Sequence, residues 1–541
     1  MGSRTLLVNF DVRLADGEKL GFLGRNGAGK TTLFNLIDGK DKDYDGIITM
    51  TKNISYMTLS QEHHERSDAT TLEHVTSRLP RYSALHNILE TYPHVMGNDM
   101  NKMHTYSEAL EEFSRLGYYD VENSMNELLD AYQLDNELLN HTFVSLSGGQ
   151  KRLIELITIQ LAEPQLALLD EPTNHMDYVA KAAFVDWLKK TKSTVMVISH
   201  DRDVLKNVER VVELKDLTSH SYPGNYDKYL YQNAIKTTNA IHAFEVTEKH
   251  IKNIGEQIAY ANTRAPGYRG KAGKNPWVVM RERLERELKE IHETHIKPSF
   301  WIDKDSTEML KPKAIDSYHK YKAKNIKLHK ADGEETSSIL LKAEDLSLGY
   351  DGVPLFQDLN FIISGGERLH VIGRNGAGKT TLVKAIMDAV DGKKPDTLIG
   401  KGIIDCARAL RISQYEQEIG PELLEMTLFD AIGQIYADKG LPVNDQSILR
   451  DMGNYLFDPI TDKATLVKNL SGGQKARLQL IRLLVGDPNL LILDEPTNHL
   501  DLPSIEELET ALQNFPGAVI YISHDSYFAK KIGGHSIIIG K

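Results

Sequence analysis

The amino-acid sequence predicts an α/β protein that contains the same domain twice, with a helical segment between the two copies. Three short motifs recur in the same order in each half of the chain, and short apolar runs lead into the first and the last of them. Continuous apolar runs of this length are typical of buried parallel strands separated by helices. The motifs are GRNGAGKTT (24–32 and 373–381), LSGGQ (146–150 and 470–474) and DEPTNH (170–175 and 494–499).

Three apolar runs in each half predict the central strands of a sheet. The first run leads directly into GRNGAGKTT, the second ends in Asp-Glu, and the third ends in Ser-His-Asp. Polar residues that follow parallel strands gather at one edge of the sheet, so these motifs are expected to meet there. The runs are 20–23, 166–169 and 195–198 in the first half and 369–372, 490–493 and 518–522 in the second.

The two halves differ in length between the first two motifs. Lys30 and Lys379 are 349 residues apart, whereas Ser147 and Ser471 are 324 apart, so the first half has a net insertion of 25 residues. The insertion falls within about residues 70–140, a polar stretch whose pattern favours helices.

Residues 222–336 show no strand pattern and predict an antiparallel helical hairpin. Two apolar stripes with near-heptad spacing are separated by a break, residues 265–276, that contains two prolines and three glycines. A flexible linker would need no such stripes. The predicted domains are therefore 1–221, the hairpin 222–336 with its tip at about 262–283, and 337–541. The stripes are Phe244, Ile251, Ile254, Ile258 and Ala261, and Met280, Leu284, Leu288 and Ile291.

The run GRNGAGKTT fits the phosphate-binding loop G-x-x-x-x-G-K-[ST], whose backbone N–H groups bind an anion at a helix N-terminus. Lys30 and Lys379 are expected to contact the β- and γ-phosphates. Thr31 and Thr380 are expected Mg²⁺ ligands.

The strand-end acids complete the predicted chemistry. Asp170 and Asp494 are placed to hold Mg²⁺, and the next residues, Glu171 and Glu495, to accept a proton from an attacking water. His200 and His524 are candidates for contact with the γ-phosphate. Gln61 and Gln417 are candidates for sensing Mg²⁺ or water, with Gln414 an open alternative to Gln417.

The bulk composition is that of a globular protein of 541 residues, with 41% hydrophobic and 26% charged residues. The sequence has no run of 18 apolar residues and no secretory signal pattern at its start. The single cysteine, Cys406, excludes an internal disulfide and a cysteine-based metal cluster. A cytoplasmic location is expected.

The motif set GRNGAGKTT, LSGGQ, DEPTNH and SHD resembles the ATP-binding cassette superfamily. The resemblance implies a Mg²⁺-dependent ATPase in which LSGGQ of one cassette closes over the ATP held by the other. It implies ATP contacts at Gly24, Asn26, Gly27, Gly29, Lys30, Thr31, Thr32, Gln61, Ser147, Gly148, Gly149, Gln150, Tyr350, Gly373, Asn375, Gly376, Gly378, Lys379, Thr380, Thr381, Gln417, Ser471, Gly472, Gly473 and Gln474.

Two fused cassettes resemble the ABC-F branch in particular. EPTNH occurs in both halves, YPGNYDKYL follows the first cassette at residues 222–230, and the insertion and hairpin look like that branch's arm and interdomain linker. The resemblance implies binding of the 70S ribosome near the tRNA exit site, with the linker directed toward 23S rRNA, P-site tRNA and the peptidyl transferase centre. Since the cassettes pair within one chain, no obligate homo-oligomer is expected.

The hairpin tip carries the residues expected to contact RNA. Residues 264–283 contain six basic residues and one acid, net +5 within a chain of −12. Basic side chains neutralise phosphates, and aromatic rings stack on bases. A second basic run, 311–330, has seven lysines and one acid, and both RNA contact and a solvated face remain open for it. The tip candidates are Arg264, Tyr268, Arg269, Lys271, Lys274 and Trp277.

The chain departs from the family pattern in two places. Tyr350 lies 29 residues before Lys379 and matches the adenine-stacking aromatic, whereas the same offset from Lys30 reaches Met1. Either the start was assigned late or the first site holds adenine more loosely. The other departure is the apolar tip around residues 275–280, which favours ribosomal protection against antibiotics. A housekeeping translation factor is the alternative, followed by the ATPase subunit of a membrane transporter.

Overall fold

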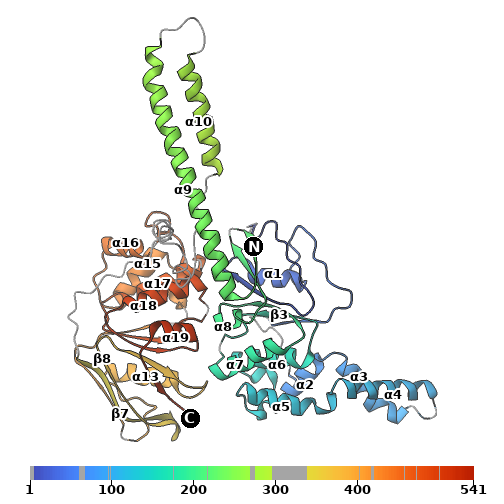
Figure 1. Cartoon of the computed structure of the whole chain (residues 1–541). Coiled ribbons are helices and arrows are strands. Elements are labelled where there is room, and N and C mark those ends of the chain that lie inside the picture. Colours follow the sequence, from blue (N-terminus) through green and yellow to red (C-terminus); the bar gives the residue numbers. More distant parts are fainter. Residues whose placement is uncertain are drawn as a thin grey trace. The chain divides into compact units, whose positions relative to one another are not determined.

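The structure is a computed structural model, and it describes residues 5–540 with the exception of 60–67, 96, 98, 175, 216, 269–274, 295–337, 401, 416–418, 456, 471 and 499. It divides into two compact units (Figure 1). One unit contains Met1–Tyr226 and Ile326–Lys541, and the other contains Asp227–Asn325. The domain bounds 1–221, 222–336 and 337–541 stay a prediction, and residues 295–336 of the predicted hairpin domain lie outside the described residues.

The first copy of the repeated domain is built on a six-stranded sheet with the order β2-β3-β4-β1-β5-β6. All neighbours pair in parallel except β5 and β6, which are antiparallel. Every residue of β3 and β4 is buried, as the continuous apolar runs predict. The strands are β1 (Lys19–Gly24), β2 (Tyr56–Leu59), β3 (Leu166–Asp170), β4 (Thr194–Ile198), β5 (Arg210–Lys215) and β6 (Thr218–Pro223).

The second copy has a five-stranded parallel sheet with the order β11-β12-β13-β9-β14, which repeats the first five positions of the other sheet strand for strand. The predicted α/β class and its duplication are therefore confirmed. The strands are β9 (Arg368–Ile372), β11 (Ile412–Tyr415), β12 (Leu490–Asp494), β13 (Ala518–Ile522) and β14 (His535–Ile538).

A second, antiparallel sheet with the order β10-β7-β8 belongs to the second copy. Tyr350 is the last residue of β7. In the first copy, the described residues 5–18, which precede β1, form no strand. The strands are β7 (Ile339–Tyr350), β8 (Val353–Ser364) and β10 (Ile403–Cys406).

Helices pack around both sheets, and each sheet has one directly after its phosphate loop (Figure 1). In the first copy they are α1 (Lys30–Ile37), α2 (Thr71–Arg78), α3 (Tyr82–Val95), α4 (Met100–Arg115), α5 (Val121–Ala131), α6 (Gly148–Ala162), α7 (Tyr178–Lys190) and α8 (Arg202–Leu205). In the second they are α13 (Lys379–Val390), α14 (Pro421–Leu424), α15 (Leu428–Asp438), α16 (Asp445–Asn454), α17 (Gly472–Leu484), α18 (Leu502–Asn514) and α19 (Ser526–Ile532).

The inserted residues of the first copy form a helical pair, α3 and α4. Leu85 of α3 and Ala109 and Phe113 of α4 are buried in one small apolar cluster, to which Leu79 also belongs. A capping box at Thr70 and Glu73 starts the preceding helix, α2. The pair lies within residues 70–140, where the sequence offsets place the insertion.

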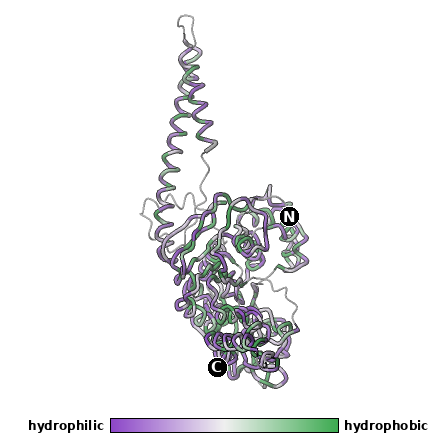
Figure 2. Tube along the Cα trace, turned by 90° about the vertical axis from the view of Figure 1, so that its right-hand side faces the viewer, coloured by the Kyte–Doolittle hydropathy of each residue, from purple (hydrophilic) through white to green (hydrophobic). Residues whose placement is uncertain are grey.

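The second unit contains a helical hairpin of α9 (Tyr226–Arg264) and α10 (Pro276–Thr294). The helices lie side by side, with hydrophilic and hydrophobic residues alternating along both (Figure 2). His250 lies 3.1 Å from Glu287, and the Tyr260 and Trp277 rings are 5.7 Å apart, so the helices run antiparallel. Ile254, Ala261 and Leu284 of the predicted stripes are buried. Within the described ranges, no helix has both the length and the apolar character of a membrane span.

A buried ion pair joins the two copies of the repeated domain. Arg202 at the start of α8 donates to Glu509 of α18 over 3.0 Å, and their side chains are only 3% and 5% exposed. Nearby, the Ser526 hydroxyl donates to Asp203 over 2.9 Å. Arg202 in the first copy and Ser526 in the second occupy equivalent positions, 324 residues apart. The second copy therefore has a serine where the first copy has the arginine of this ion pair.

Replacing Glu509 with Ala should destabilise the protein, because the Arg202 guanidinium would remain buried after losing its closest carboxylate. Loss of one partner of a buried pair costs about 3 kcal/mol. A decrease in Tm of about 5 °C or more is expected in a thermal melt.

The matched control is Asp391→Ala, which removes the exposed partner of Lys393 in a pair of 3.0 Å. An exposed pair contributes about 0.5 kcal/mol or less, so its Tm should change little. Equal Tm values for the two variants would contradict the structural role of Arg202 and Glu509.

Candidate functional site

Each phosphate loop is held in a shape that exposes backbone N–H groups at the start of a helix. Gly29 and Gly378 have φ of 93° and 94°, a left-handed conformation that favours glycine, and α1 and α13 begin at the next residue. Lys30 Nζ donates to the carbonyls of Gly24 and Arg25 over 2.7 and 3.2 Å. Lys379 makes the same two contacts with its own loop, over 2.8 and 2.9 Å.

The strand-end aspartates lie against the threonines of the phosphate loops. Thr31 Oγ1 donates to Asp170 over 2.7 Å, and Thr380 Oγ1 donates to Asp494 over 2.9 Å. Burial raises the pKa of both aspartates, while the threonine hydrogen bonds and nearby lysines act in the opposite direction. Asp170 Oδ1 is buried without a hydrogen-bond partner. A hydroxyl, a carboxylate and an unpaired carboxylate oxygen fit Mg²⁺, which prefers oxygen ligands.

No cluster of three or more His, Cys, Asp or Glu side chains that could hold a metal occurs among the described residues. Each site instead offers one carboxylate and one hydroxyl. Such a sparse set fits Mg²⁺ bound together with substrate phosphates, since this ion commonly uses one or two carboxylates and completes its shell with phosphate oxygens and water.

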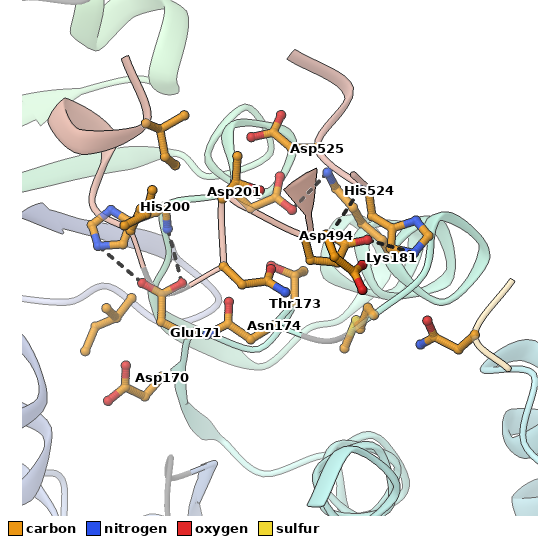
Figure 3. A pocket seen from close by; sticks show the side chains of 18 of the residues that line it. Asp170, Glu171, Thr173, Asn174, Lys181, His200, Asp201, Asp494, His524 and Asp525 are labelled. Carbon is orange, nitrogen blue, oxygen red and sulfur yellow. Dashed lines mark hydrogen bonds and ion pairs between the residues drawn. The ribbon is translucent and has the colours of Figure 1, made fainter. Parts of the chain in front are cut away.

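Glu171 and Glu495 follow the strands in a left-handed conformation, with φ of 48° and 46°. Glu171 accepts a hydrogen bond from the backbone N–H of His200 over 3.3 Å, and its other oxygen lies 3.4 Å from His200 Nε2 (Figure 3). Glu495 and His524 repeat both contacts, at 3.4 and 3.3 Å.

Both glutamate–histidine contacts lie in a strongly desolvated setting. Burial raises the pKa of Glu171 to about 8 and lowers that of His200 to about 3. In the second copy burial raises the pKa of Glu495 to about 7 and lowers that of His524 to about 4. Burial therefore opposes charge on both partners of each pair. A glutamate with a raised pKa is suited to take up a proton near neutral pH.

One cavity of about 950 Å³ is lined by predicted phosphate-loop and strand-end residues of both copies. It contains the loop lysines, the strand-end acids and both histidines, together with Tyr350 of β7. The lining residues that the sequence singles out are Asn26, Gly27, Gly29, Lys30, Thr31, Thr32, Asp170, Glu171, His200, Tyr350, Asn375, Gly376, Gly378, Lys379, Thr380, Thr381, Asp494, Glu495 and His524.

The LSGGQ residues of the first copy do not line this cavity. Ser147 caps α6 through a reciprocal capping box with Gln150, so both side chains are bonded to the helix start. In the second copy, Gly472 begins α17. Gln61, Gln417 and Ser471 lie outside the described residues, while Gln414 lies within β11.

Sequence reasoning missed two aspartates that join each phosphate loop to the other copy. Asp177 accepts a hydrogen bond from the backbone N–H of Asn375 over 3.2 Å, and Asp501 accepts one from Asn26 over 3.1 Å. Each aspartate also caps the helix that follows it. The available signal was its recurrence at the end of DEPTNHMD and DEPTNHLD, directly after the recognised motif.

Three of the residues expected to contact RNA lie in the described part of the hairpin, namely Arg264, Tyr268 and Trp277. Tyr268 is 42% exposed, and the Arg264 guanidinium lies over the Tyr260 ring at 5.4 Å. Trp277 is partly buried and packs edge-on against Tyr260, so its ring is less available for stacking on a base than that of Tyr268. Arg269, Lys271, Lys274 and the basic run 311–330 lie outside the described residues.

Comparison with known proteins shows similarity along the whole chain. A family model described as ABC transporter matches residues 7–174 and 356–498. YdiF of Bacillus subtilis (strain 168), which is named as an ATP-binding protein, is 30% identical over 538 residues, 98% of this chain and 77% of that protein. ABC transporter F family member 5 of Arabidopsis thaliana is 28% identical over 541 residues, 98% of this chain and 72% of that protein.

A solved structure titled "Model of ribosome-bound archaeal Pelota and ABCE1" contains a chain with a similar fold. The TM-score is 0.51 with 17% sequence identity, covering 97% of this chain and 72% of that one. At this identity the likeness concerns the fold alone.

Replacing Lys30 or Lys379 with Ala should remove one nucleotide site at a time. Each lysine supplies the point charge for the outer phosphates of its own loop. Isothermal titration with Mg·ATP is expected to give two bound nucleotides for the native chain and about one for each variant.

Lys40→Ala is the control, since its ammonium is largely exposed and pairs with Asp38 rather than lining the cavity. It should retain both sites. A stoichiometry of two in both loop-lysine variants would contradict the assignment of one site to each loop.

Proposed function

This chain belongs to the ABC transporter family, in its F branch, and is an ATPase; from this premise we propose that its two sites drive an action on the ribosome. The observation that carries the proposal is the duplicated cavity chemistry, combined with a helical hairpin whose sequence is basic at the tip. The two cassettes pair within the chain, so the proposed working form is a monomer in the cytoplasm.

The proposed reaction at each site depends on positioning more than on covalent chemistry. Lys30 moves from its loop carbonyls to the outer phosphates of ATP, while the N–H groups at the start of α1 hold the phosphate chain. Glu171 accepts the proton of the attacking water, and His200 orients that water or contacts the γ-phosphate. Lys379, Glu495 and His524 have the same roles in the second site.

Thr31 with Asp170, and Thr380 with Asp494, are the proposed Mg²⁺ ligands. Bound Mg²⁺ supplies positive charge to the phosphate oxygens. The aspartates would hold this charge next to the phosphate loops, where it would favour the carboxylate form of the adjacent glutamates, the form that accepts a proton. Tyr350 is proposed to stack on the adenine of the second site.

The proposed partner is the 70S ribosome, near its tRNA exit site. Support comes from F-branch relatives whose sequences align with 98% of this chain. A similar fold also occurs in a chain of a structure titled as ribosome-bound. The hairpin tip adds chemical support through Arg264 and the exposed Tyr268, which suit phosphate and base contacts with P-site tRNA or 23S rRNA. ATP binding would favour the ribosome-bound state, and hydrolysis would release it.

We further propose that the action protects the ribosome against antibiotics at the peptidyl transferase centre. The support is the apolar content of the tip, where Tyr268 and Val279 are 42% and 45% exposed. A housekeeping role in translation is the alternative. Expression in a sensitive bacterium, scored against drugs of the peptidyl transferase centre and exit tunnel, separates the two, because unchanged susceptibility to every class would remove the protection role.

The double variant Glu171→Gln with Glu495→Gln should bind ATP but hydrolyse it at least about 100-fold more slowly, because the amides retain the shape but not the base. It is expected to co-sediment with 70S ribosomes in ATP and not in ADP. If ATPase activity is lost but no ribosome-bound fraction is found, the assignment of the hydrolysis sites would remain supported and the ribosome proposal would be wrong.

Tyr268→Ala should weaken ribosome binding of that trapped form by about tenfold, since stacking on one base contributes about 1–3 kcal/mol. Basal ATPase activity should be retained in the otherwise native chain. Val279→Ala is the control for loss of an exposed apolar side chain at the tip. Equal binding of Tyr268→Ala and the parent protein would argue against base stacking by this ring.

A further inference from the structure

A polar cluster of His74, Arg78 and Glu155 joins helix α2 to helix α6 in the first copy. His74 Nε2 lies 3.1 Å from Glu155 Oε1, and these two side chains are only 4% and 7% exposed. Arg78, one turn later on α2, donates through Nη1 to both carboxylate oxygens of Glu155, over 2.5 and 2.6 Å. Hydrogen bonds assisted by charge are among the stronger polar contacts in proteins, so the polar cluster fixes α2 against α6.

The polar cluster also holds the segment that leads into the LSGGQ motif. The His74 ring stacks on the Phe143 ring, with 3.8 Å between the centroids and 8° between the planes. Phe143 is buried, and its N–H donates to the Ala69 carbonyl over 3.0 Å, directly before α2. The motif begins three residues after Phe143, at Leu146. The chain on the N-terminal side of LSGGQ is therefore packed against α2.

The chain on the other side of LSGGQ is held by the same cluster. Ser147 and Gln150 of the motif form the capping box of α6, and Glu155 lies further along this helix. Helices α2 and α6 lie next to each other in the first copy (Figure 1). The position of LSGGQ relative to α2 is thus set twice, through Phe143 before the motif and through Glu155 after it.

The second copy keeps this backbone arrangement with different side chains. The bridge between Thr427 and Leu466 repeats the one between Thr70 and Thr142, which aligns α15 with α2. This alignment gives the corresponding residues, which are Ala431 for His74, Ile435 for Arg78, Val467 for Phe143 and Gln479 for Glu155. Ala431, Ile435 and Val467 are all buried.

The comparison of the two copies separates stability from positioning. Helices α15 and α17 of the second copy also contact each other, although apolar side chains stand at three of the four positions. A buried ion pair is often no more stabilising than well-packed apolar side chains of similar volume. Stability alone therefore does not explain the polar cluster, and its contacts on both sides of LSGGQ point to a role in placing that motif.

We propose that His74, Arg78 and Glu155 are positioning residues that set the LSGGQ motif of the first copy over the second ATP site. The inference rests on the proposed function, with hydrolysis at Lys379 and Glu495, and on completion of that site by residues 147–150. The three side chains act through Phe143 and α6. Geometry at this level matters, because small displacements of a group that contacts substrate cost large factors in rate.

The test follows cleavage at each site with the other site disabled. Glu171→Gln leaves the second site, Glu495→Gln leaves the first, and one round of ADP formation from Mg·ATP is measured by rapid quench. In the Glu171→Gln background, Arg78→Ala should lower the cleavage rate constant of the second site by about tenfold or more. In the Glu495→Gln background the first site should change by about twofold or less, since its own loop and acids are distant from α2.

Two further variants show whether the contact itself is responsible. Arg78→Lys keeps a cationic donor for Glu155, although without the planar fork of arginine, so it should recover a large part of the second-site rate. His74→Ala introduces the residue of the second copy and should lower the second-site rate as well.

Arg210→Ala is the matched control, because it removes another arginine–glutamate contact of the first copy, 2.6 Å from Glu18 and remote from α6 in sequence. It should change second-site cleavage by about twofold or less. Equal losses at both sites in Arg78→Ala would overturn the inference, since they indicate general destabilisation of the first copy. An unchanged second-site rate in both Arg78→Ala and His74→Ala would overturn it too.

Ser147→Ala separates the inference from its premise. It alters the motif itself and should lower second-site cleavage. If it does so while Arg78→Ala and His74→Ala do not, the pairing of LSGGQ with the second site stands and the inference is wrong. If Ser147→Ala also has no effect, the pairing is wrong and the inference falls with it. Failure of the proposed hydrolysis chemistry is seen separately, because Glu495→Gln would then leave second-site cleavage intact.

Discussion

The site depends on one repeated contact, the hydrogen bond from a phosphate-loop threonine to the aspartate at the end of a buried strand. Thr31 and Asp170, and Thr380 with Asp494, join the start of a helix to the edge of a sheet over 2.7 and 2.9 Å. Because strands β3 and β12 are enclosed between parallel neighbours, the carboxylates have little freedom to move. The residue that follows each strand, Glu171 or Glu495, is thereby placed in the cavity.

Crowding of acids and lysines in a desolvated cavity gives the site its chemical character. Burial raises the pKa of Glu171 to about 8 and of Glu495 to about 7, and it lowers the pKa of both loop lysines. Charges that are costly to bury alone become favourable when a ligand brings phosphates and a cation together. Substrate is therefore expected to order the site as well as occupy it.

Local motifs predicted most of this arrangement, whereas contacts between distant residues were beyond the sequence. The loop, the strand ends and the histidines could be predicted because fixed spacing and parallel strands bring them to one edge. The helical hairpin could be predicted from its two apolar stripes, which include Ile254 and Leu284. Two contacts could not be predicted, because each depends on the packing of separate segments: Arg202 with Glu509, and Asp177 with Asn375. The position of the inserted helices α3 and α4 could be predicted only from the unequal spacing of the repeated motifs in the two halves.

Thermal stability measured with Mg²⁺ alone, ATP alone and both together tests the central claim most directly, namely that phosphate loop and strand-end aspartate form one site for Mg·ATP. The double variant Glu171→Gln, Glu495→Gln is suitable for this measurement, because it is expected to bind ATP without rapidly hydrolysing it. The account predicts a large rise in Tm only with both ligands, since binding to the folded state alone stabilises by mass action. The same rise with ATP in the presence of a chelator, or none with Mg·ATP, would contradict it.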